Sequence, residues 1–179
     1  MDIQLFETPY MRATLKVVQE GAGVAAYPMI ETAPAACVVP MVPMIGDHFA
    51  GNECGVVLLE QEGRPETDGK PVIKAIGGYQ RGMSPEECVR AFARSKAGII
   101  LPKRLRLLRE ATSYSVAKVP VQMFTCDEYS KVEDARLSPG CHTRLMSLRE
   151  AARLAIEGKL FDPCTVETVL ILRSLYTDR

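Results

Sequence analysis

The 179-residue sequence has no net charge, because its 22 lysines and arginines balance 22 aspartates and glutamates. A chain without a basic excess lacks the field that nucleic-acid-binding proteins present to phosphates, so we expect no nucleic-acid partner. It also lacks an apolar run of about 18 residues, the minimum for a membrane-spanning helix. The first residues, MDIQLFETPYMRATLK, contain an early acid and no long apolar stretch. We therefore expect neither a secretory signal nor membrane association.

Ligands for a soft metal are few and scattered. The only histidines are His48 and His142, and none of the six cysteines forms a Cys-x-x-Cys pair. A zinc site needs clustered thiolate or imidazole ligands, whereas Cys141 and His142 are adjacent in the turn-like sequence SPGCHT without further partners. We therefore predict no metal site, and we interpret the cysteines as reduced, mostly buried thiols of a cytoplasmic protein.

The length and the apolar content fit one domain. The chain is longer than the commonest domain but within the usual range. Hydrophobic residues make up 47% of it, which is enough for a sizeable core. We therefore predict a single domain over residues 1–179, divided into an N-terminal segment, 1–34, and a core, 35–179.

Strand and helix signals alternate along the core. Residues 35–44 (AACVVPMVPM) are apolar and β-prone, and their two prolines indicate an edge strand or a bend. Residues 54–61 have the composition of a buried strand, and a turn-rich loop over 63–71 separates them from a short strand at 72–76. Three further segments follow: 101–110 fits a strand or a short helix, 116–126 fits a strand, and 130–139 fits a polar loop.

Two helices are predicted in the C-terminal third. Ser147 and Glu150 form a capping box that begins a helix, and Gly158 suits its end. The Asp-Pro pair at 162–163 suits the start of a final helix that runs to about Tyr176.

The most informative segment covers residues 77–99 and has the sequence GGYQRGMSPEECVRAFARSKAGI. Ser84 is a favourable N-cap, and Pro85 suits the first helical position. Glu87, three residues after Ser84, completes a capping box. Because Gly98 suits the position that follows a helix, the segment predicts a loop followed by a helix that ends near residue 97.

The same segment resembles the Nudix box, the signature of hydrolases that cleave nucleoside diphosphates linked to another group. The family pattern begins with glycine, ends with glycine and an aliphatic residue, and has an arginine and several glutamates between them. Gly77 opens the pattern and Gly98-Ile99 close it, without insertion or deletion. Other residues occupy the positions of the arginine and the glutamates: Met83, Ala91, Phe92, Ser95 and Lys96.

The resemblance extends beyond the box, over about residues 35–175. The LLEQEGRP strand, the strand that leads into Gly77-Gly78 and the C-terminal MSLREAARLAIEGKLFDPCTVETVLILRSL resemble the ADP-ribose pyrophosphatase branch of the Nudix superfamily. That resemblance implies the α/β class, with a Nudix-like α/β/α sandwich around a mixed β-sheet. It also implies a homodimer, with residues 1–34 as the candidate dimer-forming segment, and Mg²⁺-dependent hydrolysis of ADP-ribose or a related nucleoside diphosphate derivative.

The missing glutamates change the expected chemistry. In the family, carboxylates three and four residues apart share a helix face and hold the Mg²⁺ that neutralises the diphosphate and helps to activate water. Here Phe92 has no ligand atom, and Lys96 puts an ammonium where the dication would sit. We therefore expect a non-hydrolytic binder in which Lys96, with Arg94 or Arg81, contacts phosphate and Phe92 packs against ribose or base. The predicted ligand-binding residues are Lys74, Gly77, Gly78, Arg81, Phe92 and Lys96.

Two alternatives stay open. A divergent Nudix hydrolase would use Mg²⁺ and displaced acids, with Glu86, Glu87 and Glu128 as the catalytic candidates, although the first two also suit helix capping. A homo-oligomeric scaffold without a small ligand would have a filled pocket. An open cleft lined by Lys74, Gly78 and Arg81 would count against that scaffold.

Overall fold

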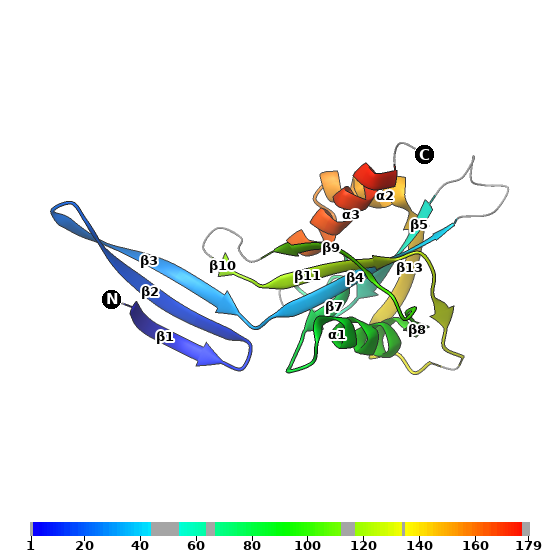
Figure 1. The fold of residues 1–179 in the computed structure, drawn as a ribbon, viewed down its shortest axis with the longest axis horizontal. Coiled ribbons are helices and arrows are strands. Elements are labelled where there is room, and N and C mark those ends of the chain that lie inside the picture. Colours follow the sequence, from blue (N-terminus) through cyan, green and yellow to red (C-terminus); the bar gives the residue numbers. More distant parts are fainter. Residues whose placement is uncertain (1, 44–53, 64–66, 112–116, 134, 177–179) are drawn as a thin grey trace.

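The computed structural model describes residues 2–43, 54–63, 67–111, 117–133 and 135–176. They form a mixed α/β body, from residue 35 onward, and an N-terminal arm of strands that projects from it (Figure 1). No helix in the described ranges is long and apolar enough to cross a membrane. His48 and residues 64–66 of the predicted loop lie outside the described residues.

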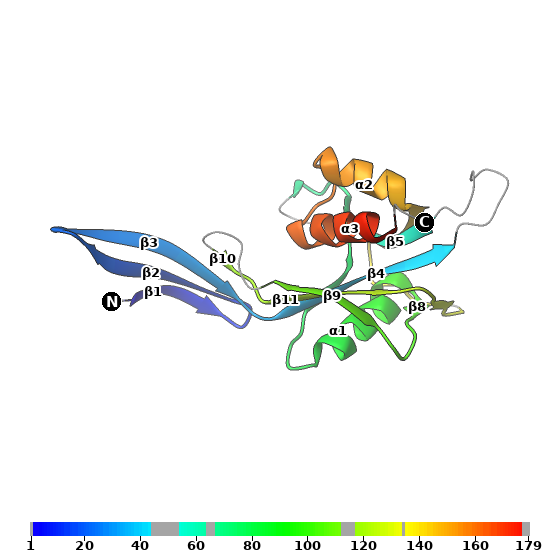
Figure 2. The ribbon, with the colours of Figure 1, turned by 45° about the horizontal axis from the view of Figure 1, so that its top comes forward.

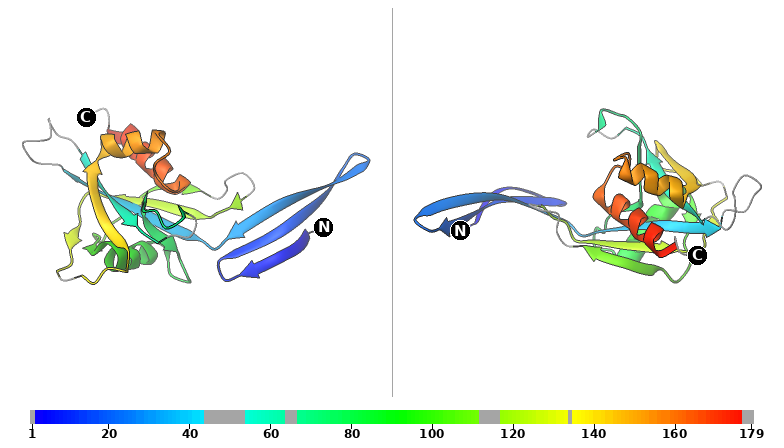
Figure 3. Two further views of the ribbon diagram at one scale, coloured as in Figure 1. Left: turned by 180° about the vertical axis from the view of Figure 1, so that it is seen from behind. Right: turned by 90° about the horizontal axis from the view of Figure 1, so that it is seen from above.

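The arm is an antiparallel sheet of β1 (Asp2–Thr8), β2 (Met11–Glu20) and β3 (Gly23–Thr32), extended by β10 (Ala117–Lys118), which pairs parallel with β3. Figure 3 shows it extending away from the body, with no helix on either face. Ala13 is the only buried residue among those described in β1 to β3. The arm therefore has almost no core of its own.

The body contains a mixed seven-stranded sheet with the order β13-β5-β4-β11-β9, to which β6 adds beside β5 and β7 beside β4. Its only parallel pair within this order is β4 with β11. A separate pair, β8 with β12, lies at one end of the body. The strands are β4 (Ala35–Pro43), β5 (Cys54–Gln61), β6 (Val72–Lys74), β7 (Ile76–Tyr79), β8 (Ile99–Ile100), β9 (Arg106–Ala111), β11 (Val121–Cys126), β12 (Ser130–Lys131) and β13 (Cys141–Ser147).

The edge-strand interpretation of residues 35–44 is wrong, because β4 lies inside the sheet between β5 and β11. Along one side, β4 pairs with β7 up to Val38 and with β5 from Met41 onward. Pro40 lies between these two ladders, so its missing amide hydrogen interrupts neither of them. The sheet accommodates the proline at the point where the neighbouring strand changes.

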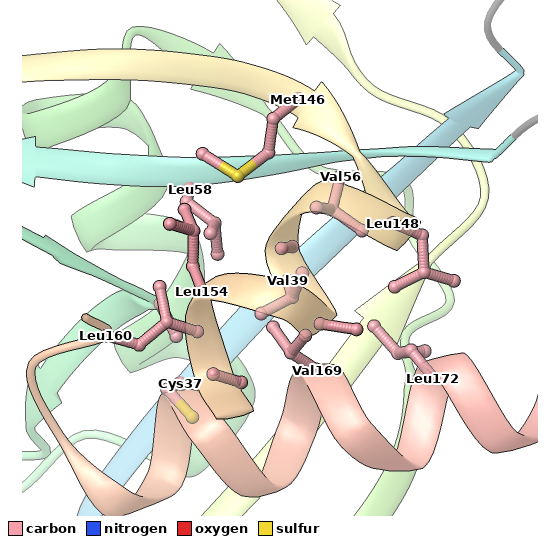
Figure 4. Close-up of a cluster of buried hydrophobic side chains, with 14 of the residues drawn as sticks. Cys37, Val39, Val56, Leu58, Met146, Leu148, Leu154, Leu160, Val169 and Leu172 are labelled. Carbon is pink, nitrogen blue, oxygen red and sulfur yellow. The ribbon is translucent and has the colours of Figure 1, made fainter. Parts of the chain in front are cut away.

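Helices cover both faces of the sheet (Figure 2). α1 (Pro85–Phe92) lies on one face, whereas α2 (Leu148–Ile156) and α3 (Pro163–Tyr176) lie on the other. Because successive strand residues point to opposite faces, Val57 and Leu59 pack with the α1 side while Val56 and Leu58 pack with α2 and α3 (Figure 4). The alternation of buried residues along one strand therefore builds two cores.

The helix starts predicted from the sequence are confirmed. At α1, the Ser84 hydroxyl accepts a hydrogen bond from the Glu87 amide, and the Glu87 carboxylate accepts one from the Ser84 amide at 2.9 Å. The Ser147 hydroxyl accepts from the Glu150 amide at 3.1 Å to begin α2. The Asp162 carboxylate accepts from the Thr165 amide at 2.8 Å at the start of α3. Each cap satisfies amides that the first helical turn leaves without a partner.

The helical segment over residues 85–97, which we call the box helix, does not end as an ordinary α-helix does. After Phe92 the chain continues as a π-helical turn, η2 (Ala93–Ala97), and then reaches Gly98 at φ 62°. The Ser95 carbonyl accepts a hydrogen bond from the Ser138 amide at 2.9 Å, which draws it to a neighbouring loop. Gly98 confirms the predicted helix end, because its left-handed conformation suits glycine.

The middle segments are resolved into shorter strands than the sequence indicates. Residues 101–110 contain the strand β9 and not a helix, and among the described residues of 130–139 only Ser130–Lys131 form a strand, β12. The predicted strand at 72–76 divides into β6 and β7, because the Ala75 amide donates to the Thr165 hydroxyl at 2.7 Å and not to a neighbouring strand. Within 116–126, residue 116 lies outside the described ranges, and β10 and β11 are separated at 119–120.

Candidate functional site

A cavity of about 330 Å³ lies where β7 meets the box helix and the start of α3; we call it the box cavity. Its lining includes residues of the paired strands β4 and β7, of the last turns of the box helix and of the segment that leads into α3. All six predicted ligand-binding residues line it: Lys74, Gly77, Gly78, Arg81, Phe92 and Lys96. The fold thus brings together residues from β6, β7, the following turn, α1 and η2.

The two glycines shape this cavity by allowing close packing. A Cβ on Gly77 would lie 2.1 Å from the Ala36 carbonyl oxygen, because β7 runs directly against β4 there. A Cβ on Gly78 would lie 2.7 Å from the ring of Phe92. A larger residue at Gly77 would push β7 away from β4, whereas one at Gly78 would displace the Phe92 ring. Gly77 and Gly78 are therefore needed for close packing inside the protein as well as being predicted to contact a ligand.

Phe92 and Lys96 form one unit on the wall of the cavity. The Lys96 ammonium lies 4.3 Å from the centroid of the Phe92 ring, a cation–π contact. Both side chains are half-buried. Neither side chain is an oxygen ligand of the kind that Mg²⁺ prefers. Within the described part of the chain, no three His, Cys, Asp or Glu side chains lie close enough to hold a metal ion.

The charge of the lining is predominantly positive. Lys74, Arg81 and Lys96 contribute three cationic side chains. Among the described lining residues, Asp162 is the sole carboxylate. Both of its oxygens accept hydrogen bonds from Thr165, one from the amide and one from the hydroxyl, each at 2.8 Å. Because this carboxylate is held as a helix cap, the cavity favours an anionic ligand.

The start of α3 is fixed against the sheet, and this brings the lining residues from α3 into place. The Phe161 amide donates to the Ile73 carbonyl at 3.0 Å, and the Ala75 amide donates to the Thr165 hydroxyl at 2.7 Å. Sequence reasoning missed Phe161, Asp162 and Cys164 as lining residues. The only signal at 162–163 was a helix start, which says nothing about which strand the helix meets.

The arm reaches the edge of the cavity through one aromatic residue. Tyr10, in the turn between β1 and β2, stacks on Tyr79 with ring centroids 5.6 Å apart and planes inclined by 20°. The Arg81 guanidinium carbon lies 5.3 Å from the Tyr10 ring centroid. Tyr79 and Arg81 both line the box cavity. No sequence pattern indicated that Tyr10 contacts them.

The candidate catalytic acids do not line the box cavity. Glu87 caps α1, and hydrogen bonds from the Ser84 side chain and backbone lower the pKa of its carboxyl group. Glu86 pairs with Arg90 at 3.4 Å. Glu128 lies with Asp127 in a different surface pocket, beside residues 102–106. The structure therefore does not gather these three carboxylates at the predicted binding residues.

Arg94, considered above as a second phosphate contact, does not line the cavity and is exposed.

Compared with known proteins, the chain matches no family model and no curated protein sequence. The shape and charge of the box cavity are therefore the observations from which a function is inferred.

Proposed function

We propose that the chain is a Nudix-like α/β/α sandwich protein that binds a nucleoside diphosphate derivative in the box cavity without hydrolysing it. The observation that carries this proposal is the convergence of six residues on one cavity with three cationic side chains. Helices on both faces of the mixed sheet agree with such a sandwich. The capped helix after Gly77-Gly78 agrees with the box resemblance.

The lining residues suit the parts of such a ligand. Lys96 and Arg81 donate charge-assisted hydrogen bonds to the diphosphate oxygens. The rings of Phe92 and Tyr79 pack against ribose or base. The Lys96 ammonium neutralises phosphate charge as a metal ion would, but it does not lower the pKa of a bound water as a metal does. Binding without hydrolysis follows from this replacement.

The hydrolase alternative has less support. It requires carboxylates that hold Mg²⁺ near the phosphates, together with a base for the attacking water. Asp162, the sole carboxylate among the described lining residues, is held by Thr165, while Glu86 and Glu87 serve the start of α1 and do not line the cavity. Mg²⁺ is a cofactor only under this alternative.

A ligand-free scaffold also has less support, because Lys74, Gly78 and Arg81 line an open cavity.

We nevertheless propose a homodimer. The arm is a sheet with both faces exposed, and a stable sheet buries at least one face against a second layer. A second copy of the chain supplies that layer. None of the six cysteines, all of which lie in the described ranges, forms a disulfide, and this agrees with a reducing, cytoplasmic location.

Calorimetric titration of ADP-ribose, NAD and ADP in buffer with a chelator tests the binding proposal. We expect at least one of them to bind without metal, and Lys96→Ala to weaken that binding about tenfold or more, as for loss of a hydrogen bond to a charged group. Arg94→Ala is the matched control, since Arg94 is a cation two residues away that does not line the cavity. Equal affinity of the wild type and Lys96→Ala would refute the phosphate contact.

An assay with Mg²⁺ and Mn²⁺ against nucleoside diphosphate sugars tests the loss of hydrolysis, with alkaline phosphatase added to free inorganic phosphate from the two monophosphates that cleavage would give. We expect no turnover above the rate without protein. Turnover that Glu87→Gln abolishes and Lys96→Ala preserves would support the divergent hydrolase in place of the binder.

A further inference from the structure

Among the described strands, β9 and β13 are the two edges of the seven-stranded sheet. The ladder between β9 and β11 contains a register shift. Side chains of α3 also hold two arginines of β9, since Arg106 donates to the Tyr176 hydroxyl at 2.6 Å. The second, Arg109, pairs with Glu167 at 2.7 Å. Irregular pairing and charged side chains protect an edge from another chain. β13 lacks such an interruption, because it pairs with β5 in one continuous register.

The outer side of β13 has backbone groups available for pairing. Directly before the strand, the Gly140 carbonyl accepts a hydrogen bond from the Glu62 amide at 2.7 Å. In an antiparallel ladder, alternate residues turn their amide and carbonyl toward the partner strand. The backbone groups of Thr143 and Leu145 therefore point away from β5. No loop or turn backbone in the described ranges binds them.

The two faces of β13 present different side chains along this edge, because successive residues point to opposite faces. Thr143 and Leu145 point to the face that α1 covers, and Leu145 is 54% exposed. His142 and Arg144 point to the other face, on which Met146 packs with α2 and α3 (Figure 4). An added strand would therefore meet an uncharged row on one face and a basic row on the other.

A cavity of about 410 Å³, which we call the edge cavity, opens beside Thr143 and Leu145. Its other walls are Val57 of β5, residues 97–99 and part of the segment 129–137. Most of the lining is apolar, and Lys131 is the sole charged residue among the described lining residues. The edge cavity shares no described lining residue with the box cavity. Because it extends along two residues of one strand face, it suits alternate side chains of an added strand.

The basic row determines which charge a partner needs. The Arg144 guanidinium pairs with Glu60 of β5 at 3.3 Å, yet its side chain is 42% exposed. A guanidinium has five N–H donors, so it can bind a further carboxylate. β13 itself contains no acid. A second copy of β13 would bring another arginine and histidine to this edge, whereas acidic side chains on an added strand are complementary to it.

We propose that β13 is a docking site for an extended segment of a partner protein in which apolar and acidic residues alternate. The segment adds antiparallel to β13. Its apolar residues lie opposite Thr143 and Leu145 and enter the edge cavity, and its acidic residues lie on the other face beside His142 and Arg144. Main-chain hydrogen bonds supply affinity and the alternate side chains supply specificity. This docking does not depend on the ligand of the box cavity.

Titration of the full chain with a short synthetic peptide of alternating valine and glutamate tests the site, with backbone amides followed by NMR. We expect saturable shifts at the amides of β13. In the proposed pairing the valine amides face β13 and the glutamate amides face away. N-methylation of the valines should therefore weaken binding about tenfold or more, as for loss of a main-chain hydrogen bond. N-methylation of the glutamates is the matched control and should leave the affinity nearly unchanged.

A variant of the edge gives a second test. Thr143→Pro removes an outward-facing amide and leaves the ladder with β5 intact, so the affinity for the peptide should fall about tenfold or more. Thr143→Val keeps that amide and is the control. Circular dichroism confirms the fold of each variant, and if Thr143→Pro does not fold, the two N-methylated peptides decide.

Three results would overturn the proposal. The first is a wild-type chain that does not bind the valine–glutamate peptide, or binds it equally with lysine in place of glutamate. The second is an equal loss of affinity on N-methylation of the valines and of the glutamates. The third is a wild-type dimer that Thr143→Pro dissociates in sedimentation velocity, because β13 would then pair with a second copy of itself.

Discussion

The arm and the body of this chain contain strands of similar regularity but very different burial. In the arm, β2 and β3 pair along their whole length, yet Leu5 on the adjoining β1 is 54% exposed. In the body, Val38 on β4 and Leu58 on β5 have no exposed surface. The comparison separates two contributions to a sheet, because backbone pairing defines the arm whereas side-chain burial on two faces stabilises the body.

The largest expected effect comes from the core of the body. Leu58→Ala removes a fully buried side chain between the sheet and α2 and α3, so we expect the free energy of unfolding to fall by about 2–5 kcal/mol. Urea denaturation followed by circular dichroism measures it. Leu145→Ala, on the neighbouring strand β13 but 54% exposed, is the control, with an expected change within about 0.5 kcal/mol. Equal losses in the two variants would remove the distinction between buried and exposed strand positions.

The second-largest expected effect is on the oligomeric state, and it tests whether a second copy of the chain covers the arm. If a second copy covers its apolar side chains, Leu5→Glu should convert a dimer to a monomer while leaving the unfolding of the body unchanged. Sedimentation velocity at micromolar concentration measures the mass. Leu145→Glu is the control, since it adds the same charge at an equally exposed leucine of the body. A wild-type monomer under these conditions would show that the arm is stable with both faces exposed.

A smaller effect is expected at the junction of the two regions. Tyr10→Ala removes the stack on Tyr79 and the contact with Arg81, so the free energy of unfolding should fall by about 0.5–1.5 kcal/mol. Tyr10→Phe keeps the ring and should retain most of that stability. If both substitutions have the same effect, the aromatic contact does not connect the arm to the body.

The smallest effect tests a local interaction that depends on neither burial nor partner. Hydrogen bonds from Ser84 lower the pKa of Glu87 below its ordinary value of 4.5. The contribution of this cap is therefore fully present above about pH 4.5 and is lost as the pH falls through the lower pKa of the folded state. Glu87→Gln should reduce the loss of stability between pH 5 and pH 3. Urea midpoints at several pH values measure it, and an unchanged pH dependence would contradict the capping interpretation.

The sequence predicted the features that short segments determine. Ser84, Ser147 and Asp162 begin the three α-helices in the described residues, because an N-cap acts within its own first turn. Contacts between distant segments were less predictable. Pro40 led to the wrong prediction of an edge strand. The strand paired with β4 changes from β7 to β5 near this proline, and no local pattern reveals a change that depends on how distant strands pair. The break at Ala75 depends on a hydroxyl from Thr165, which lies 90 residues away.

The residues of the candidate site show the same difference between local features and contacts of distant segments. The box motif indicated Gly77, Phe92 and Lys96 together because they belong to one local unit, and the fold gathers them in one cavity. Tyr10 and Cys164 come from the arm and from α3, so no local pattern related them to the box. In the arm, apolar and polar residues alternate along β2 from Met11 to Val17, the period of a strand, so this strand could have been predicted from the sequence.

The π-helical turn over Ala93–Ala97 holds one residue more than α-helical winding would over the same segment. Deleting one residue between Ala93 and Ser95 would leave the lysine three positions after Phe92 in place of four, and residues three and four apart share a helix face. The ammonium group would therefore stay beside the Phe92 ring, over which it now lies at 4.3 Å from the centroid. The wider turn thus lets the helix change in length without losing the cation on the cavity wall.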